Sequence, residues 1–278
     1  MKSHIQPCFP HVAFLILFLL AVLPNRVLSR KELQPVLSLK HLEGCRKGKT
    51  VKGLHEVKSY LKRFGYANVV ANINDYRRDD DTFDDVLESE IKAYQLNQNL
   101  DVTGKLDTRT LEQMMLPRCG VPDIDENGES SMRWKQYGPN FNFYSRKKHW
   151  PPSKYNLTYK FTSDGSAPSK IDDQTLRDVC ARAFAAWAGV THFQFREAAH
   201  AFAPTDGRLH YDADENWGTG QASDETDLES VTVHEIGHIL GLRHTSDEQA
   251  VMFPTIGQGV VKRQLGSDDI KGVQTLYA

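Results

Sequence analysis

The sequence has few cysteines, which limits what can hold it together. Cys8 lies in an apolar N-terminal stretch, so Cys45, Cys119 and Cys180 remain for the rest of the chain. An odd number in so long a chain excludes the disulfide framework of a small secreted domain. Cys180 falls on an apolar helical stripe and is expected to be buried, whereas Cys45 is either free or paired with another chain.

An excess of charge of one sign is also absent. Lys and Arg number 34 and Asp and Glu number 36, for a net charge of -2, and there are no internal repeats or long low-complexity tracts. This balance gives no sign of a nucleic-acid partner. With 40% hydrophobic and 25% charged residues over 278 positions, we expect a soluble globular protein with two domains.

The one strongly apolar run, His11–Leu23, is short for a bilayer span and follows Lys2. We predict that residues 1–29 are a signal peptide, with an uncleaved anchor as the alternative. The chain ends without a hydrophobic tail, so we expect no membrane anchor after signal removal and secretion to the extracellular space or matrix. Asn156 begins a glycosylation sequon, and a glycoprotein is therefore predicted.

A cluster of histidines near the C-terminus is the strongest chemical signal. His234 and His238 are spaced i, i+4, which puts both imidazoles on one helix face. Gly241 can take a positive φ and end the helix, so that His244 can turn back as a third nitrogen. Glu235 lies beside the metal position, where a carboxylate can serve as a general base. Three nitrogens with one open position are typical of a catalytic zinc site.

Further motifs extend this pattern to a known family. Met252 follows the third histidine, as in the Met-turn of metzincins. With HEIGHILGLRH (234–244), PRCGVPD (117–123) and DLESV (227–231), the chain resembles a matrix metalloproteinase, or matrixin, of the small plant type without a haemopexin domain. The resemblance runs from about residue 39 to residue 277 and implies a zinc endopeptidase in which Met252 packs beneath the metal.

The heptapeptide around Cys119 has its own chemistry. A thiolate is a strong zinc ligand, and at the catalytic zinc it would occupy the position that water needs. Arg118 and Asp123 can pair and hold the loop in shape. The resemblance identifies this motif as the cysteine switch, which keeps a secreted zymogen inactive until another protease removes the propeptide.

The resemblance and the hydrophobic patterning together predict an α+β fold. Residues 30–123 form a propeptide with a small three-helix, peptidoglycan-binding-like bundle, for which an independent carbohydrate-binding role is the weaker alternative. Residues 124–140 form an exposed linker, and residues 141–278 form a metzincin-type protease domain with a twisted mixed sheet and helices. TDLE (226–229) reads as a capping box that opens the active-site helix, and SDDI (267–270) as the cap of the last helix.

The sequence departs from the matrixin pattern just before His200. The strand and the His-x-Asp loop that the family places there have no counterpart. Of the four structural-zinc ligands, His200 and His210 remain, which leaves an incomplete second zinc site. Asp212 and Glu215 match calcium ligands of the family, although a solvated loop is an equally good interpretation of them.

Two functional interpretations follow. In the first, a secreted, monomeric zinc endopeptidase is made as a zymogen and hydrolyses peptide bonds in extracellular or matrix proteins, with Glu235 moving the proton. In the second, the missing segment has removed the substrate-binding edge, and the chain is a zinc-binding pseudoprotease or a truncated splice form.

Overall fold

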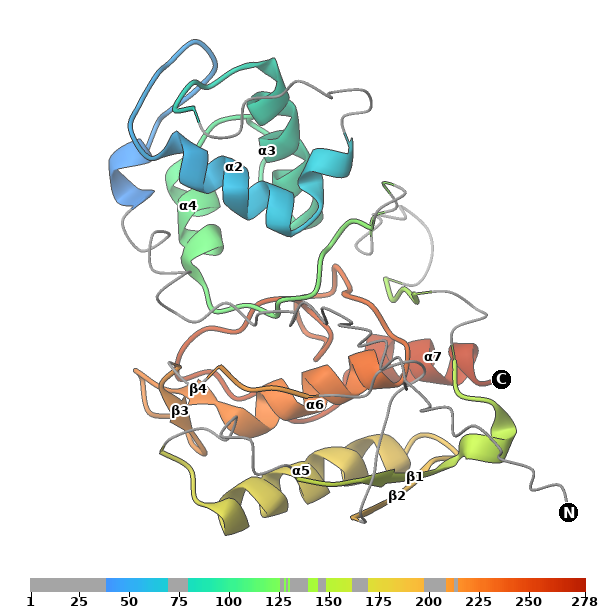
Figure 1. Cartoon of the computed structure of the whole chain (residues 1–278). Helices are drawn as coiled ribbons and strands as arrows, with labels where there is room; N and C mark the ends of the chain where they lie inside the picture. The colour runs from blue at the N-terminus through green and yellow to red at the C-terminus, as the bar shows by residue number, and fades with distance from the viewer. Residues whose placement is uncertain are drawn as a thin grey trace, which may run out of the picture.

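The computed structural model forms two bodies, a helical one above and a mixed one below in the view of Figure 1. The segment that follows α4 runs between them. The structure describes residues 39–69, 80–125, 128, 130, 140–144, 149–161, 170–197, 209–212 and 215–278. The predicted signal peptide at residues 1–29 lies outside these ranges.

The upper body is the predicted three-helix bundle. Its helices are α2 (Leu54–Arg63), α3 (Asp85–Asn97) and α4 (Thr108–Met115), with a 3-10 turn η2 (Tyr66–Val69) between the first two. Apolar residues recur along each helix at the spacing that places them on one face, and these faces meet in a buried core. That core includes Leu54, Val57, Leu61, Phe64, Tyr66, Leu87, Ile91, Tyr94, Leu111 and Met114.

Helices α3 and α4 both begin with an aspartate cap. Asp84 accepts a hydrogen bond from the amide of Leu87, and Asp107 accepts one from the amide of Thr110. Each carboxylate satisfies an amide that has no partner inside the helix. Helix α4 therefore starts at a defined residue, and the chain leaves its other end in an extended conformation at Leu116.

The lower body begins with a short 3-10 turn, η3 (Pro152–Lys154), and a sheet beside α5 (Asp173–Ala188). Strands β1 (Asn156–Tyr159) and β2 (Gln194–Glu197) pair in parallel. Figure 1 shows α5 running alongside both strands. Phe184 on α5 stacks on Tyr159 with ring centroids 4.3 Å apart, so aromatic side chains join the helix to the sheet.

A second parallel pair joins β3 (Trp217–Gly218) to β4 (Thr226–Asp227), immediately before α6 (Leu228–Ile239). Helix α6 packs on α5, and the indole of Trp187 donates a hydrogen bond to the carbonyl of Val233 at 2.9 Å. The last helix, α7 (Ser267–Leu276), lies beyond the C-terminal end of α6 in Figure 1.

Two of the sequence-based helix caps need correction by one residue. Asp227, not Thr226, caps α6, and its carboxylate accepts from the amide of Ser230 at 2.8 Å. The N-cap of α7 is Gly266 rather than Ser267, and the carboxylate of Asp269 accepts from its amide. At α6 the Asp227 carboxylate accepts from a first-turn amide, whereas at α7 the Asp269 carboxylate reaches back to the amide of the N-cap residue.

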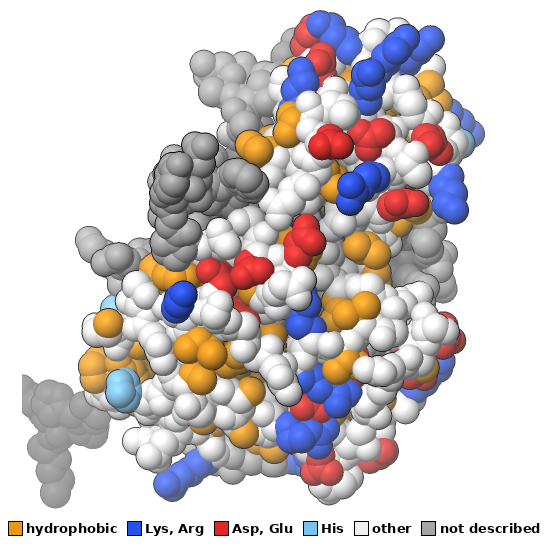
Figure 2. Space-filling view, turned by 180° about the vertical axis from the view of Figure 1, so that it is seen from behind, with side chains coloured by type: hydrophobic (Ala, Val, Ile, Leu, Met, Phe, Trp, Pro, Cys, Tyr) orange, Lys and Arg blue, Asp and Glu red, His pale blue; other side chains and the backbone are white. Residues whose placement is uncertain are grey.

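The α+β fold class is confirmed. The strand expected to be missing would follow β2, and residues 198–208 lie outside the described ranges, so that expectation stays a prediction. On the face shown in Figure 2, acidic and basic side chains are interspersed over the helical body. Among the described helices, none combines the length and the apolar character needed to cross a membrane.

Candidate metal centre

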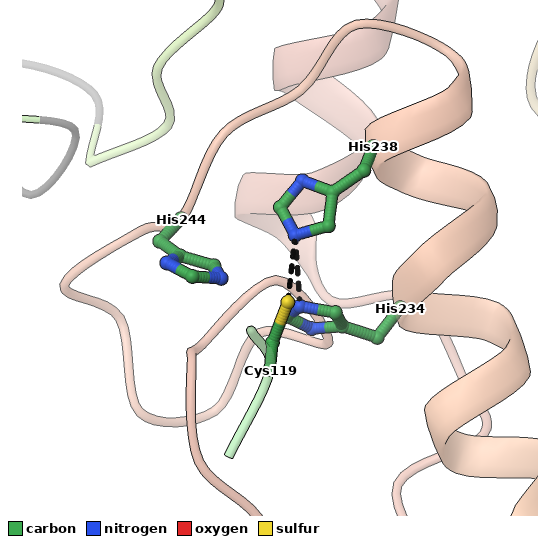
Figure 3. Close-up of side chains that lie close together, drawn as sticks. All are labelled: Cys119, His234, His238 and His244. Carbon is green, nitrogen blue, oxygen red and sulfur yellow. Dashed lines mark hydrogen bonds between the residues drawn. The ribbon is translucent and has the colours of Figure 1, made fainter. Parts of the chain in front are cut away.

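Helix α6 brings the first two histidines together. His234 and His238 are one turn apart, and their Nε2 atoms lie 3.1 Å from each other (Figure 3). His234 is buried and His238 is partly buried. The helical spacing that predicted a shared face therefore also brings the two ring nitrogens to one point.

A glycine turn brings the third histidine back to this point. Gly241 has φ 103°, which L residues other than glycine rarely adopt. The amide of Leu242 bonds the carbonyl of Gly237 at 3.0 Å, closing the end of the helix. His244 then lies fully buried, with its ring 5.0 Å from that of His238.

The methionine turn packs against α6, and the Val251 carbonyl contacts His234. Met252 is buried, and the carboxylate of Asp269 on α7 accepts hydrogen bonds from the amides of Val251 and Met252 at 2.8 and 3.0 Å. Helix α7 thereby fixes the turn. A Cβ atom added to Gly237 would run into Met252 Sδ and lie 2.9 Å from Trp187 Cζ2, so α6 fits this turn only with glycine there.

We therefore expect Gly237→Ala to lower the free energy of unfolding by about 1–3 kcal/mol, because the added methyl overpacks a dense core. Chemical denaturation of the full chain measures this change. Gly189→Ala is the matched control, because a Cβ there would meet the Ala185 carbonyl at 3.5 Å and φ is -64°. An equal loss in the two variants would contradict the packing argument.

The fourth side chain comes from the segment after α4. Residues 117–119 lie along the chain that follows Met252. The amide of Cys119 donates a hydrogen bond to the Pro254 carbonyl at 3.0 Å, and the amide of Ile256 donates one to the Pro117 carbonyl at 3.1 Å. This pairing places Cys119 Sγ 3.4 Å from His238 Nε2 (Figure 3). The ligand atoms of Cys119 and the three histidines all lie within 4.8 Å of one another.

Each ring is oriented by a hydrogen bond at its Nδ1 atom. His234 Nδ1 lies 2.7 Å from the Val251 carbonyl, and His238 Nδ1 lies 2.8 Å from the Leu242 carbonyl. A carbonyl oxygen can only accept, so Nδ1 carries a proton in both rings, and in the neutral form of each ring the lone pair is on Nε2. The two Nε2 lone pairs thus face each other at 3.1 Å, an arrangement that a cation between them would stabilise.

The third ring follows the same pattern with a different partner. His244 Nδ1 lies 2.9 Å from a carboxylate oxygen of Asp123, and its buried Nε2 has no hydrogen-bond partner. Burial lowers the pKa of His244 to about 4, although Asp123 opposes the shift. Burial and the neighbouring histidines also hold the pKa of His238 below its usual range. Neutral rings with converging Nε2 atoms fit a zinc ion.

Glu235 and Cys119 face each other beside this group. Both line a cavity of about 180 Å³ whose apolar wall includes Val231, Phe253 and Ile256. Burial, followed by the charge of Glu235, raises the pKa of the Cys119 thiol. Zinc would reverse this preference, because a coordinating thiol gives up its proton.

Comparisons with known proteins agree with this geometry. A family model described as Matrixin matches residues 196–278, and one described as Putative peptidoglycan binding domain matches residues 50–114. The chain is 39% identical to Metalloendoproteinase 5-MMP of Arabidopsis thaliana, in an alignment that covers 85% of this chain and 74% of the relative. It is 40% identical to Metalloendoproteinase 1 of Glycine max, with 83% of each covered. This chain belongs to the matrixin family.

As a matrixin, the protein is a zinc metalloendopeptidase that acts on peptide or protein substrates. Macrophage metalloelastase of Oryctolagus cuniculus is also similar, at 32% identity over 69% of this chain. The alignment with 5-MMP runs over 280 positions although it covers 85% of a 278-residue chain. The relative therefore has residues with no counterpart in this chain.

Among the residues that the structure describes, the other predicted metal ligands of this matrixin form no cluster. His200 lies outside the described residues, and His210 is exposed. Asp212 and Glu215 are near each other, with the Glu215 amide bonded to the Asp212 carbonyl at 3.3 Å. Among the described residues, the group of Cys119 with the three histidines is the one that could hold a metal. The calcium site and the second zinc site stay predictions.

Sequence reasoning missed one contact at this centre. It paired Asp123 with Arg118, and the structure has this pair at 2.8 Å. It did not foresee that the same carboxylate reaches His244, which is 121 residues further along the chain. Local spacing carries no signal for so distant a contact.

Proposed function

We propose that this matrixin is made as a secreted zymogen in which Cys119 blocks the catalytic zinc. The observation that carries the proposal is the position of Cys119 Sγ, which lies 3.4 Å from His238 Nε2 in a cavity that Glu235 also lines. One thiol thus lies at the metal centre and in the same cavity as the Glu235 carboxylate. Water would need this same space during peptide hydrolysis.

We assign the zinc to His234, His238 and His244, with Cys119 as the fourth ligand of the inactive form. When bound, zinc polarises a peptide carbonyl and lowers the pKa of water at the open position. Glu235 accepts the proton of the attacking water and delivers it to the leaving amine. Met252 supports the histidines from below and takes no part in the chemistry.

The backbone that follows Met252 is the proposed wall of the substrate cleft. In the zymogen it pairs with residues 117–119, and its carbonyl and amide groups become available when that segment leaves. An extended peptide can use the same groups for strand-like pairing. The apolar lining by Phe253 and Ile256 favours an apolar substrate side chain after the scissile bond.

The proposed activation cleavage lies in residues 124–140, between the switch and the catalytic domain. The chain on the far side of this linker is already anchored to the catalytic domain. The Asn140 amide bonds Asp268 at 3.1 Å, the Arg243 amide bonds the Asn142 carbonyl at 2.9 Å, and Phe143 pairs with Leu242. Cleavage before Asn140 by an activating protease leaves these contacts in place.

Secretion, an extracellular substrate and a monomeric state belong to the same proposal. They rest on the apolar stretch at residues 11–23 and on the balanced charge of the chain. Asn156 is exposed at the start of β1, which suits a glycosylation site.

The second candidate function is a zinc-binding pseudoprotease, and it is supported by the unmatched residues in the alignment with 5-MMP. If the relatives' additional residues form the strand that completes the substrate cleft, this chain binds zinc but hydrolyses peptides poorly or not at all. Zinc content does not separate the two candidates, whereas turnover does.

The deciding experiment is hydrolysis of a quenched peptide series by the purified full chain, after a thiol-reactive mercurial has displaced Cys119. We expect peptide turnover that disappears when a chelator removes the metal and returns when zinc is added, because zinc is needed to activate the water and polarise the peptide carbonyl. The untreated zymogen is the control. A folded chain with one zinc per molecule that cleaves no peptide would contradict the protease assignment and support the second candidate.

A further inference from the structure

We propose that Asp123, a residue of the inhibitory segment, is a positioning residue for the zinc ligand His244. This inference rests on the proposed zinc centre and adds a second function to the switch segment. In this arrangement the segment contributes a metal ligand through Cys119 and also orients one of the three permanent ligands through Asp123.

The three histidines differ in where their supporting acceptor comes from. His234 and His238 donate from Nδ1 to the carbonyls of Val251 and Leu242, both in the catalytic domain. His244 instead donates to Asp123, which precedes the linker. Partners of this kind fix the tautomer and the ring orientation of a metal-binding histidine. Removal of the propeptide therefore takes away the Nδ1 partner of His244 alone.

Asp123 is held rigidly enough to orient a ring. Its side chain is fully buried, and one carboxylate oxygen accepts from Arg118 and from His244. The other oxygen accepts from the hydroxyl of Tyr66 at 2.6 Å. Its backbone amide bonds the carbonyl of Phe64 at 3.0 Å. The carboxylate is thus fixed to the core of the helical bundle from several sides.

The charge on Asp123 suits this function. Its carboxylate forms an ion pair with the Arg118 guanidinium at 2.8 Å and accepts a hydrogen bond from the Tyr66 hydroxyl at 2.6 Å. A carboxylate paired with a guanidinium in this way is ionised and can only accept. His244 must keep its proton on Nδ1, so its Nε2 lone pair points at the metal position.

A simpler explanation is that Asp123 only neutralises Arg118 and touches His244 by chance. The two explanations predict different changes in zinc affinity when the Asp123 contacts are broken. A purely structural ion pair would loosen the switch loop when broken, without changing how the three histidines hold the metal. A positioning role predicts weaker zinc binding even when Cys119 is no longer a ligand.

The experiment uses the full chain with Cys119→Ser as background, so that the thiolate makes no contribution. Zinc affinity is measured by competition with a chromophoric chelator, with and without Asp123→Asn. We expect Asp123→Asn to raise the zinc Kd by about 10-fold or more, since partners of ligating histidines contribute about 10–100-fold to metal affinity. The variant keeps the shape of the side chain and removes its charge and one acceptor oxygen.

Asp125→Asn is the matched control in the same background. Asp125 also joins this segment to the catalytic domain, through Arg243 at 3.4 Å, but it contacts no proposed ligand. A rise in Kd of about 10-fold or more with Asp123→Asn that is absent with Asp125→Asn supports the proposal. Any other pattern, including an equal rise in both variants, overturns it.

A second measurement does not depend on whether a variant folds. In the unsubstituted, zinc-loaded full chain labelled with ¹⁵N in its histidine rings, three rings should show a zinc-shifted Nε2. The proposal requires all three to keep an Nδ1 proton, with one shifted downfield as expected for a bond to a carboxylate. Only two such protons would overturn it. Neither zinc affinity nor the histidine spectrum depends on peptide hydrolysis. A chain that binds zinc without cleaving peptides would contradict the protease assignment, and the role of Asp123 could still be tested on it.

Discussion

Glu235→Ala is expected to abolish peptide hydrolysis and to leave zinc binding intact. Glu235 follows His234 directly on α6 and lines the cavity beside the metal centre, but it is not one of the four side chains whose ligand atoms converge. Loss of a general acid–base group typically lowers the rate by about 10²–10⁴-fold. Peptide turnover after mercurial treatment and zinc content per molecule are the two measurements.

Glu248→Ala is the control for this substitution. Glu248 is exposed in the loop after His244, and it neither lines the cavity nor belongs to the converging group. We therefore expect the activity of Glu248→Ala to match that of the unsubstituted chain. If Glu235→Ala loses zinc as well as activity, the loss of activity comes from the damaged metal site and contradicts the expectation that Glu235 serves only as the base. If it binds zinc and still cleaves at the original rate, Glu235 is not the base.

The sequence predicted those parts of the centre that depend on local geometry. The helical period places His234 and His238 together, and the glycine at position 241 has the positive φ that turns the chain back to His244. These features need only the residues between 234 and 244. The three helices of the upper body were predictable for the same reason, because one-sided apolar spacing within each helix signals its buried face.

The sequence could not predict which partners meet across long separations. Asp123 bonds His244, and Asp269 on α7 bonds the backbone under the histidines, because packing brings separate elements together. A one-residue difference in capping also escaped prediction, since Thr226 and Asp227 both have side chains that can cap a helix. In each case several acceptors were chemically suitable, and only the tertiary contacts select one.

Cys119→Ser is expected to make the full chain active without mercurial or cleavage. In the proposed zymogen, zinc holds the Cys119 thiolate at the position that water needs. Structural zinc sites contribute about 10–16 kcal/mol through four ligands, so one thiolate accounts for about 3 kcal/mol. A serine hydroxyl is a much poorer zinc ligand. The loss corresponds to about 10²-fold in the equilibrium between blocked and open forms, and spontaneous peptide turnover should rise accordingly.

The segment keeps its other contacts in this variant, which makes the result informative. The Cys119 amide still bonds Pro254, the Ile256 amide still bonds Pro117, and Gln113 still reaches Thr255 at 3.0 Å. Cys45→Ala, in the core of the helical bundle, is the control for general loosening and should stay inactive until treated with mercurial. A Cys119→Ser chain that is zinc-loaded yet inactive until a protease removes the propeptide would mean that backbone pairing along the cleft, and not the thiolate, enforces the inhibition.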